Sequence, residues 1–184
     1  MRNTSIHVAY ELSPSSERFV TLDRYIDADW LGFSAIPKNG LERKIQRPKL
    51  SRYRAAFETV LSTRHRENPF IISHMPILSV AIESAKALLG NSSPHIAFSF
   101  NYTTLPTGNR QTWHKRMLAN VDRFVVFSNY ERQLYAEYFG LPENRFVFTP
   151  WTQDPPPVAV LNDIPFGGDY ICAIGGEVAF TDDG

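Results

Sequence analysis

The sequence contains a single cysteine, Cys172, so no disulfide bond can form within the chain. A small protein held together by a disulfide framework is therefore excluded, and a reducing compartment such as the cytoplasm is the expected location. The sequence also lacks an apolar run long enough to span a bilayer, and residues 1–30 carry acids and bases throughout. It therefore predicts neither a transmembrane helix nor a signal peptide.

Neither sign of charge dominates, because Lys and Arg together number 19 and Asp and Glu together also number 19. The charges are unevenly placed: residues 38–66 hold nine Lys or Arg against two Glu, whereas residues 151–184 hold six acids and no Lys or Arg. A neutral protein without a recognisable nucleic-acid-binding motif is not expected to bind nucleic acid. Its 184 residues, 43% of them hydrophobic, are enough to bury a substantial core.

From residue 68 onward, short apolar segments alternate with helical patterns. The first helical pattern has Pro76 near its start and Gly90 just past its end, as helices commonly do. Near-continuous apolar strands that alternate with helices predict a parallel sheet covered by helices on both faces, an α/β Rossmann-like fold. The predicted strands are 69–73, 95–100, 123–128 and 145–149, and the predicted helices are 76–89, 107–121 and 130–139.

The first 67 residues give weaker signals. We expect strands over 6–12 and 30–36 and either a helix or a strand over 19–28. Residues 48–66 predict an amphipathic, basic helix. The basic segment 38–66 either forms a solvated surface, which is the commoner outcome, or makes a peripheral contact with an anionic membrane.

The composition changes after Trp151, where Asp154 is followed by three prolines. A stiff, extended segment of this kind is typical of an interdomain linker. Farther on, a short strand pattern leads into the glycine turn Gly175-Gly176, and the sequence ends eight residues later. We therefore expect an N-terminal Rossmann-like domain, a linker and the start of an incomplete second domain, over residues 1–151, 152–168 and 169–184.

Several motifs occur in an order and spacing typical of one enzyme family. The strand of residues 70–74 ends in Ser-His, VDRFVVFSNYE enters a helix at Ser128, YFGLPENR ends that helix at a glycine, and TPW follows the last strand. In these motifs, residues 68–150 resemble the N-terminal, acceptor-side domain of family 4 glycosyltransferases. These enzymes are of the GT-B type, in which two Rossmann-like halves face each other across a cleft. Residues 169–176 are similar to the first strand and glycine turn of the family's nucleotide-binding half.

The resemblance implies transfer of a sugar from a nucleotide-diphosphate sugar to an acceptor hydroxyl, with retention and without an obligatory metal. The implied partners are the nucleotide sugar as co-substrate and a carbohydrate or lipid-linked acceptor, and no further cofactor is implied. The family's first glycine turn corresponds here to the Ser-Pro-Ser-Ser of residues 13–16. The family's donor-site residues have no counterpart, so the chain alone is expected to be inactive. A noncatalytic α/β module that binds a carbohydrate or a protein is the alternative.

Polar side chains follow the ends of three predicted strands. His74 follows the first, Asn101 and Tyr102 follow the second, and Asn129 follows the third. Because parallel strands bring their carboxyl ends to one edge, we expect these residues to converge there. The resemblance and this placement together predict a catalytic role for His74, acceptor binding by Asn101, Tyr102, Asn129, Trp151 and Thr152, and nucleotide-sugar binding by Gly175 and Gly176.

Other polar patterns have structural explanations. Ser128 and Glu131 are spaced as a helix capping box. The Asp-Ala-Asp of residues 27–29 matches a metal-binding motif of another glycosyltransferase fold, but its position near the N-terminus predicts an acidic turn. His65 and His114 have no partner at zinc-ligand spacing. The sequence therefore predicts no metal site, and the absence of a Gly-x-Ser-x-Gly elbow disfavours a hydrolase.

Overall fold

A computed structural model describes residues 4–11, 25–45 and 49–150 of the chain. Several features predicted from the sequence lie outside the described residues. They are the Ser-Pro-Ser-Ser of residues 13–16, Trp151, Thr152, the linker 152–168, and the second domain 169–184 with Gly175 and Gly176.

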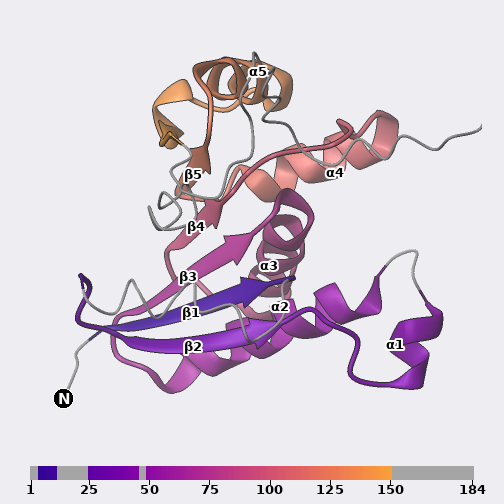
Figure 1. The fold of residues 1–184 in the computed structure, drawn as a ribbon, viewed down its shortest axis with the longest axis vertical. Helices are drawn as coiled ribbons and strands as arrows, with labels where there is room; N and C mark the ends of the chain where they lie inside the picture. The colour runs from indigo at the N-terminus through magenta and orange to yellow at the C-terminus, as the bar shows by residue number, and fades with distance from the viewer. Residues whose placement is uncertain (1–3, 12–24, 46–48, 151–184) are drawn as a thin grey trace, which may run out of the picture. The chain divides into compact units, whose positions relative to one another are not determined.

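Among the described residues, six strands form one sheet in which every neighbouring pair is parallel, in the order β2-β1-β3-β4-β5-β6. Figure 1 shows β2, β1, β3, β4 and β5 following one another in this order. The predicted α/β fold with a Rossmann-like parallel sheet is thus confirmed. The strands are β1 (Ser5–Tyr10), β2 (Asp29–Ser34), β3 (Pro69–His74), β4 (His95–Phe98), β5 (Arg123–Val126) and β6 (Phe146–Phe148).

The helices after residue 68 begin and end close to the positions that the sequence predicts. Gly90 and Gly140 end two of them in the left-handed conformation, with φ of 63° and 61°, where only glycine carries no steric penalty. One short helix was not predicted from the sequence, although its N-cap Asn39 accepts a hydrogen bond from the Glu42 N–H at 2.9 Å. The helices are α1 (Gly40–Lys44), α2 (Leu50–Ser62), α3 (Pro76–Leu89), α4 (Gly108–Leu118) and α5 (Asn129–Phe139), with 3-10 turns η3 (Thr63–His65) and η4 (Glu143–Arg145).

The register of the strands separates the two faces of the sheet. Ile71 lies in the core cluster beneath α2 and α3, and Phe124 lies in the cluster beneath α4 and α5, on the same face. Val8 and Phe70 belong to a separate apolar cluster on the opposite face. Among the described residues, the four longer helices therefore pack on one face. The connection between β1 and β2 falls mostly in residues 12–24, outside the described ranges.

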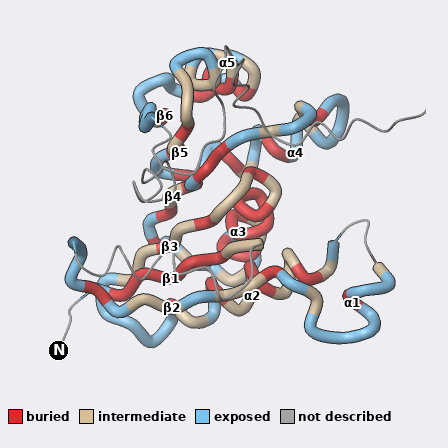
Figure 2. Tube along the Cα trace, viewed as in Figure 1, coloured by how far each residue is buried: buried red, intermediate tan, exposed pale blue. Residues whose placement is uncertain are grey.

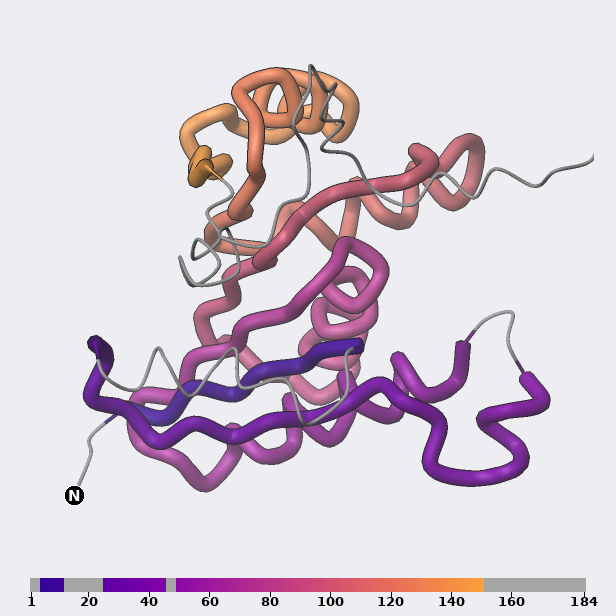
Figure 3. Tube along the Cα trace, in the orientation of Figure 1, coloured from indigo at the N-terminus to yellow at the C-terminus, as the bar shows by residue number. Residues whose placement is uncertain are grey.

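The order of the strands reverses at β1. The chain first moves from β1 to β2 on one side, and it then crosses to β3 on the other side and continues outward to β6. Figure 3 shows indigo β1 lying between violet β2 and the magenta β3 segment. In open α/β sheets, ligands bind beyond the carboxyl ends of the strands at such a reversal. A ligand is therefore expected beyond the carboxyl ends of β1 and β3.

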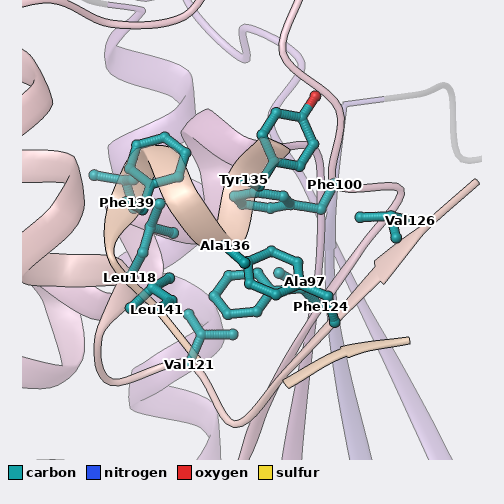
Figure 4. Close-up of a cluster of buried hydrophobic side chains, with 12 residues drawn as sticks. Ala97, Phe100, Leu118, Val121, Phe124, Val126, Tyr135, Ala136, Phe139 and Leu141 are labelled. Carbon is teal, nitrogen blue, oxygen red and sulfur yellow. The ribbon is translucent and has the colours of Figure 1, made fainter. Parts of the chain in front are cut away.

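Phe100 is the centre of the core beneath α4 and α5. Its ring is fully buried, and it makes edge contacts with Phe124 at 4.7 Å, Tyr135 at 5.3 Å and Tyr102 at 5.5 Å between centroids. Figure 4 shows its ring packed between Tyr135 and Phe124, and Figure 2 shows the buried inner side of α5 beside its exposed outer side. Edge-to-face aromatic pairs add to the free energy gained from burial. Loop 99–106 is thereby held to the sheet through Phe100.

The basic side chains of α2 are paired with acids rather than left free. Arg54 lies 2.8 Å from Glu42 and 2.8 Å from Glu58, and Arg52 lies 2.5 Å from Glu11. A backbone hydrogen bond from residue 38 and the Arg54 guanidinium together lower the pKa of Glu42. Within this part of the segment, positive charge is locally balanced.

The apolar side of α2 is used in the core. Tyr53 and Phe57 pack against the cluster that contains Ile71, whereas Leu61 is 43% exposed. This arrangement favours a solvated basic surface over membrane docking, and contact with a membrane through residues 38–66 stays a prediction. Among the residues that the model describes, no helix has the length and apolar character needed to cross a bilayer.

Two buried histidines link stability to pH. His7 lies 2.6 Å from Ser62 Oγ and 3.0 Å from Ser5 Oγ, and burial together with Arg66 lowers its pKa to about 4. Burial, with a smaller effect of Arg110, likewise lowers the pKa of His114 to about 4. Both imidazoles are therefore neutral at neutral pH.

Because these folded-state pKa values lie below the unfolded value of 6.5, the unfolded chain takes up protons first as the pH falls. We expect the free energy of unfolding contributed by His7 and His114 to be complete above about pH 6.5 and to decline toward about pH 4. Urea unfolding across this range measures the decline, and NMR titration assigns it. Ring signals of either histidine that titrate near its unfolded value of 6.5 would contradict this account.

Candidate functional site

The candidate site lies at the edge where β3, β4 and β5 end. His74 is the last residue of β3 and pairs in register with Phe98, the last residue of β4. Asn101 follows β4 in the next loop, and Asn129 begins α5 after β5. Because all strands are parallel, these positions lie beyond the same edge of the sheet. The functional roles predicted for His74, Asn101 and Asn129 stay predictions.

The turn between β3 and α3 has an unusual backbone. Met75 has φ of 75° and ψ of 144°, a backbone conformation that residues other than glycine rarely adopt. Its N–H donates to the Phe98 carbonyl at 3.2 Å, which ties the turn to β4. Pro76 then occupies the first turn of α3, and no side chain caps this helix. The positive end of the α3 dipole is therefore directed to the same edge as His74.

His74 faces away from the four longer helices. Side chains alternate along a strand, so the buried Ser73 lies on the helical face and His74 lies on the opposite one. Phe98 shares the face of His74; it is 39% exposed, and its ring meets that of Phe127 edge-on at 6.2 Å. The edge thus offers a half-buried imidazole beside a partly exposed aromatic ring.

Sequence reasoning missed Phe98 as a site residue. It treated residues 95–100 as one buried strand, whereas β4 ends at Phe98. The available signal was its position, since Phe98 alternates with the small residue Ala97, which is fully buried in the core. An aromatic residue at the carboxyl end of a strand, on the face away from the helices, is a candidate for ligand contact.

The loop that carries Asn101 is firmly anchored. On one side of this exposed residue, the Phe100 N–H donates to the Val125 carbonyl at 2.9 Å. On the other side, the Tyr102 N–H donates to the Tyr135 hydroxyl at 2.9 Å. The loop therefore presents the Asn101 amide from a fixed backbone, which lowers the entropy cost of using it in binding.

Tyr102 points inward rather than toward the edge. Its hydroxyl lies 2.8 Å from His114 Nδ1, and its ring packs 5.5 Å from Phe139. Burial raises the pKa of Tyr102, and its neutral hydroxyl forms a hydrogen bond with the neutral imidazole of His114. Its role here is to support the loop; acceptor binding by Tyr102 stays a prediction, and the partly exposed aromatic ring at this edge is that of Phe98.

Ser128 caps α5, as its spacing from Glu131 predicts. The Ser128 hydroxyl accepts the Glu131 N–H at 3.1 Å, and the Glu131 carboxylate accepts the Phe127 N–H at 3.1 Å. The predicted capping role of Ser128 is thereby confirmed. Asn129, the first residue of the helix, is left exposed at the edge.

A buried group imitates a catalytic triad. His95 Nδ1 lies 2.7 Å from Glu83 Oε1, and His95 Nε2 lies 2.7 Å from Ser73 Oγ. A Ser-His-acid arrangement of this kind activates a nucleophile when a substrate reaches the serine. Ser73 and His95 have no exposed surface, and Glu83 is 2% exposed. The group is therefore closed to substrate, and sequence reasoning missed it because its members are spread over β3, α3 and β4.

The acidic pair of residues 27–29 lies away from the candidate site. Asp29 is the first residue of β2, at the amino edge of the sheet, and it lies 3.8 Å from Arg66. Within residues 4–11, 25–45 and 49–150, no group of three or more His, Cys, Asp or Glu side chains is arranged to hold a metal ion.

The fold defines the class of the protein as a Rossmann-like α/β domain. No model of a known protein family matches the chain, and no curated protein matches it in sequence. Because Rossmann-like folds carry many unrelated activities, a function has to be argued from the site.

Replacement of Tyr102 tests the support beneath the Asn101 loop. Tyr102→Phe keeps the ring but leaves His114 Nδ1 buried without its hydroxyl partner, so we expect the free energy of unfolding to fall by about 1–3 kcal/mol. Tyr130→Phe is the matched control, because Tyr130 is 72% exposed and a surface change of this kind costs less than about 0.5 kcal/mol. Equal stability of the two variants in urea unfolding would show that the hydroxyl contact contributes nothing.

Proposed function

We propose that the chain is the acceptor-side half of a GT-B-type glycosyltransferase. In this role it binds an acceptor hydroxyl and presents it to a nucleotide-diphosphate sugar across a cleft. The observation that carries the proposal is the placement of His74 beside Phe98 beyond the ends of β3 and β4, next to the reversal of strand order. The sequence resemblance to family 4 glycosyltransferases independently supports the same role.

The chemistry of this edge suits a carbohydrate. A sugar ring presents polarised C–H groups on its faces and hydroxyl groups around its rim. The electron-rich face of an aromatic ring such as Phe98 attracts the C–H groups, whereas the His74 imidazole and the amides of Asn101 and Asn129 can each exchange hydrogen bonds with hydroxyls. A few directed polar groups around an apolar contact are typical of small-ligand sites.

His74 would act on the acceptor hydroxyl. A neutral imidazole nitrogen accepts a proton from a hydroxyl that it contacts, which makes the hydroxyl oxygen a better nucleophile. Nucleotide-sugar binding then belongs to a second Rossmann-like half, and this part of the proposal includes the roles predicted for Gly175 and Gly176. Retention of configuration and independence from metal are parts of the proposal that come from the resemblance.

The alternative is a noncatalytic module that binds a carbohydrate or a protein partner through the same edge. The partly exposed Phe98 and exposed Asn101 serve binding equally well without chemistry. The two functions differ in their dependence on His74. A binding module uses His74 only as a hydrogen-bond partner, whereas transfer also requires it to accept the hydroxyl proton.

Carbohydrate binding tests the site directly. In saturation-transfer NMR with a panel of common mono- and disaccharides, we expect contact with the wild-type chain and an affinity at least about tenfold lower for His74→Ala, as the loss of a ligand hydrogen bond predicts. His65→Ala is the matched control, since His65 is an exposed histidine in η3, near the amino edge of the sheet. The site assignment fails if the two variants bind alike, or if no saccharide binds. Unfolding of His74→Ala should match that of wild type, because the side chain is only half buried.

Catalysis is tested with the donor. Incubated with a panel of nucleotide-diphosphate sugars and the saccharides that bind, the 184-residue chain alone should transfer no sugar, because donor binding is assigned to a second half. Sugar transfer by this chain would contradict that division of labour, and its loss in His74→Ala would at the same time assign the base.

A further inference from the structure

A chain of buried polar groups connects α3 and β4 to the turn that carries His74. Glu83 Oε1 lies 2.7 Å from His95 Nδ1, and the opposite nitrogen of His95 lies 2.7 Å from Ser73 Oγ. Ser73 Oγ lies 2.8 Å from Ser79 Oγ, and Ser79 Oγ lies 3.1 Å from the Met75 carbonyl oxygen. Every side chain in this chain of contacts, from Glu83 to Ser79, is at most 2% exposed.

The charge of Glu83 sets the direction of these hydrogen bonds. Burial alone would raise the pKa of Glu83, but the hydrogen bond from His95 and the nearby Lys86 ammonium, at 2.9 Å, keep it below its usual value. Burial also lowers the pKa of His95, so the pair is a carboxylate and a neutral imidazole. The imidazole proton must then lie on Nδ1, facing Glu83, and Nε2 must accept the Ser73 hydroxyl.

Ser79 joins this chain of contacts to the turn that carries His74. Ser73 Oγ lies within hydrogen-bond distance of both His95 Nε2 and Ser79 Oγ. The Ser79 hydroxyl is placed between Ser73 Oγ and the Met75 carbonyl, which belong to the residues on either side of His74. The Ser79 N–H also donates to the Met75 carbonyl at 3.1 Å. A single buried side chain thus contacts both neighbours of His74.

We propose that Ser79, held by Ser73 and His95, is a positioning residue that fixes the His74–Met75 turn in its strained conformation. A non-glycine residue with the φ and ψ of Met75 persists only when its surroundings hold it there. The contacts from Ser79 hold the turn from the helical face of the sheet. The hydrogen bond from the Met75 N–H to the Phe98 carbonyl holds it to β4. The inference goes beyond the proposed function, because it concerns the shape of the turn and holds for any ligand.

The chain offers a matched control on the same helix. Ser84 is also in α3, and its hydroxyl donates to the carbonyl four residues earlier, Val80, at 2.8 Å. Ser79→Ala and Ser84→Ala therefore remove the same kind of hydroxyl-to-carbonyl hydrogen bond within one helix. Only the first also breaks the connection to Ser73.

Amide hydrogen exchange and NMR of the full-length chain test the proposal. In Ser79→Ala we expect the Met75 amide to exchange at least about tenfold faster, in line with the loss of one or two buried hydrogen bonds, while Ile82 in the same helix changes less. The His74 ring signals should shift in the same variant. In Ser84→Ala, the exchange of Met75 and the ring signals of His74 should both remain as in wild type.

Three outcomes decide against the proposal. Unchanged Met75 exchange in Ser79→Ala, or an equal increase in Ser84→Ala, would show that Ser79 has no special hold on the turn. An equal increase at Ile82 would mean that the whole helix has been destabilised. Ser73→Ala provides a second test if Ser79→Ala does not fold, since it breaks the same connection and should accelerate exchange at Met75. No activity is measured, so these results are independent of whether the protein transfers sugar.

Discussion

In the part of the chain that the structure describes, all six strands run in the same direction, and the rest of the fold depends on this constraint. A parallel strand can follow its predecessor only after the chain has crossed back over the sheet, so a return segment separates each strand from the next. The return segments start at one edge and finish at the other. Helix C-termini such as the one at Gly90, and the start of β2, therefore lie at the amino edge of the sheet. His74 and the N-termini of α3 and α5 lie at the carboxyl edge.

The fold after residue 68 was predictable because each signal there is local. Gly90 and Gly140 mark helix ends by backbone conformation, Ser128 marks a helix start by a capping bond, and apolar strands lie between them. In the first part of the chain, the helix α1 was missed although Asn39 and Glu42 carry its cap. Its five residues show no apolar periodicity that would predict a helix.

The candidate site was only partly predictable. Strand direction alone places His74, Asn101 and Asn129 at one edge, and that logic needs only the βα alternation. The inward turn of Tyr102 was not predictable, because it depends on His114, a residue in a different element. The buried pairing of Glu83 with His95 was invisible for the same reason. Contacts between elements carry no signature in the sequence of either element.

The separation in sequence between paired strands has a consequence for the order of folding. The aromatic core around Phe100 joins strands and helices that follow one another closely, so its contacts close short loops. The pairing of β1 with β3 instead brings Ser5 beside Pro69, which requires closure of a far longer loop. Longer loops cost more entropy to close, so we expect β4 to β6 to form the early nucleus. The carboxyl ends of β1 and β3 would then come together last, when β1 inserts between β2 and β3.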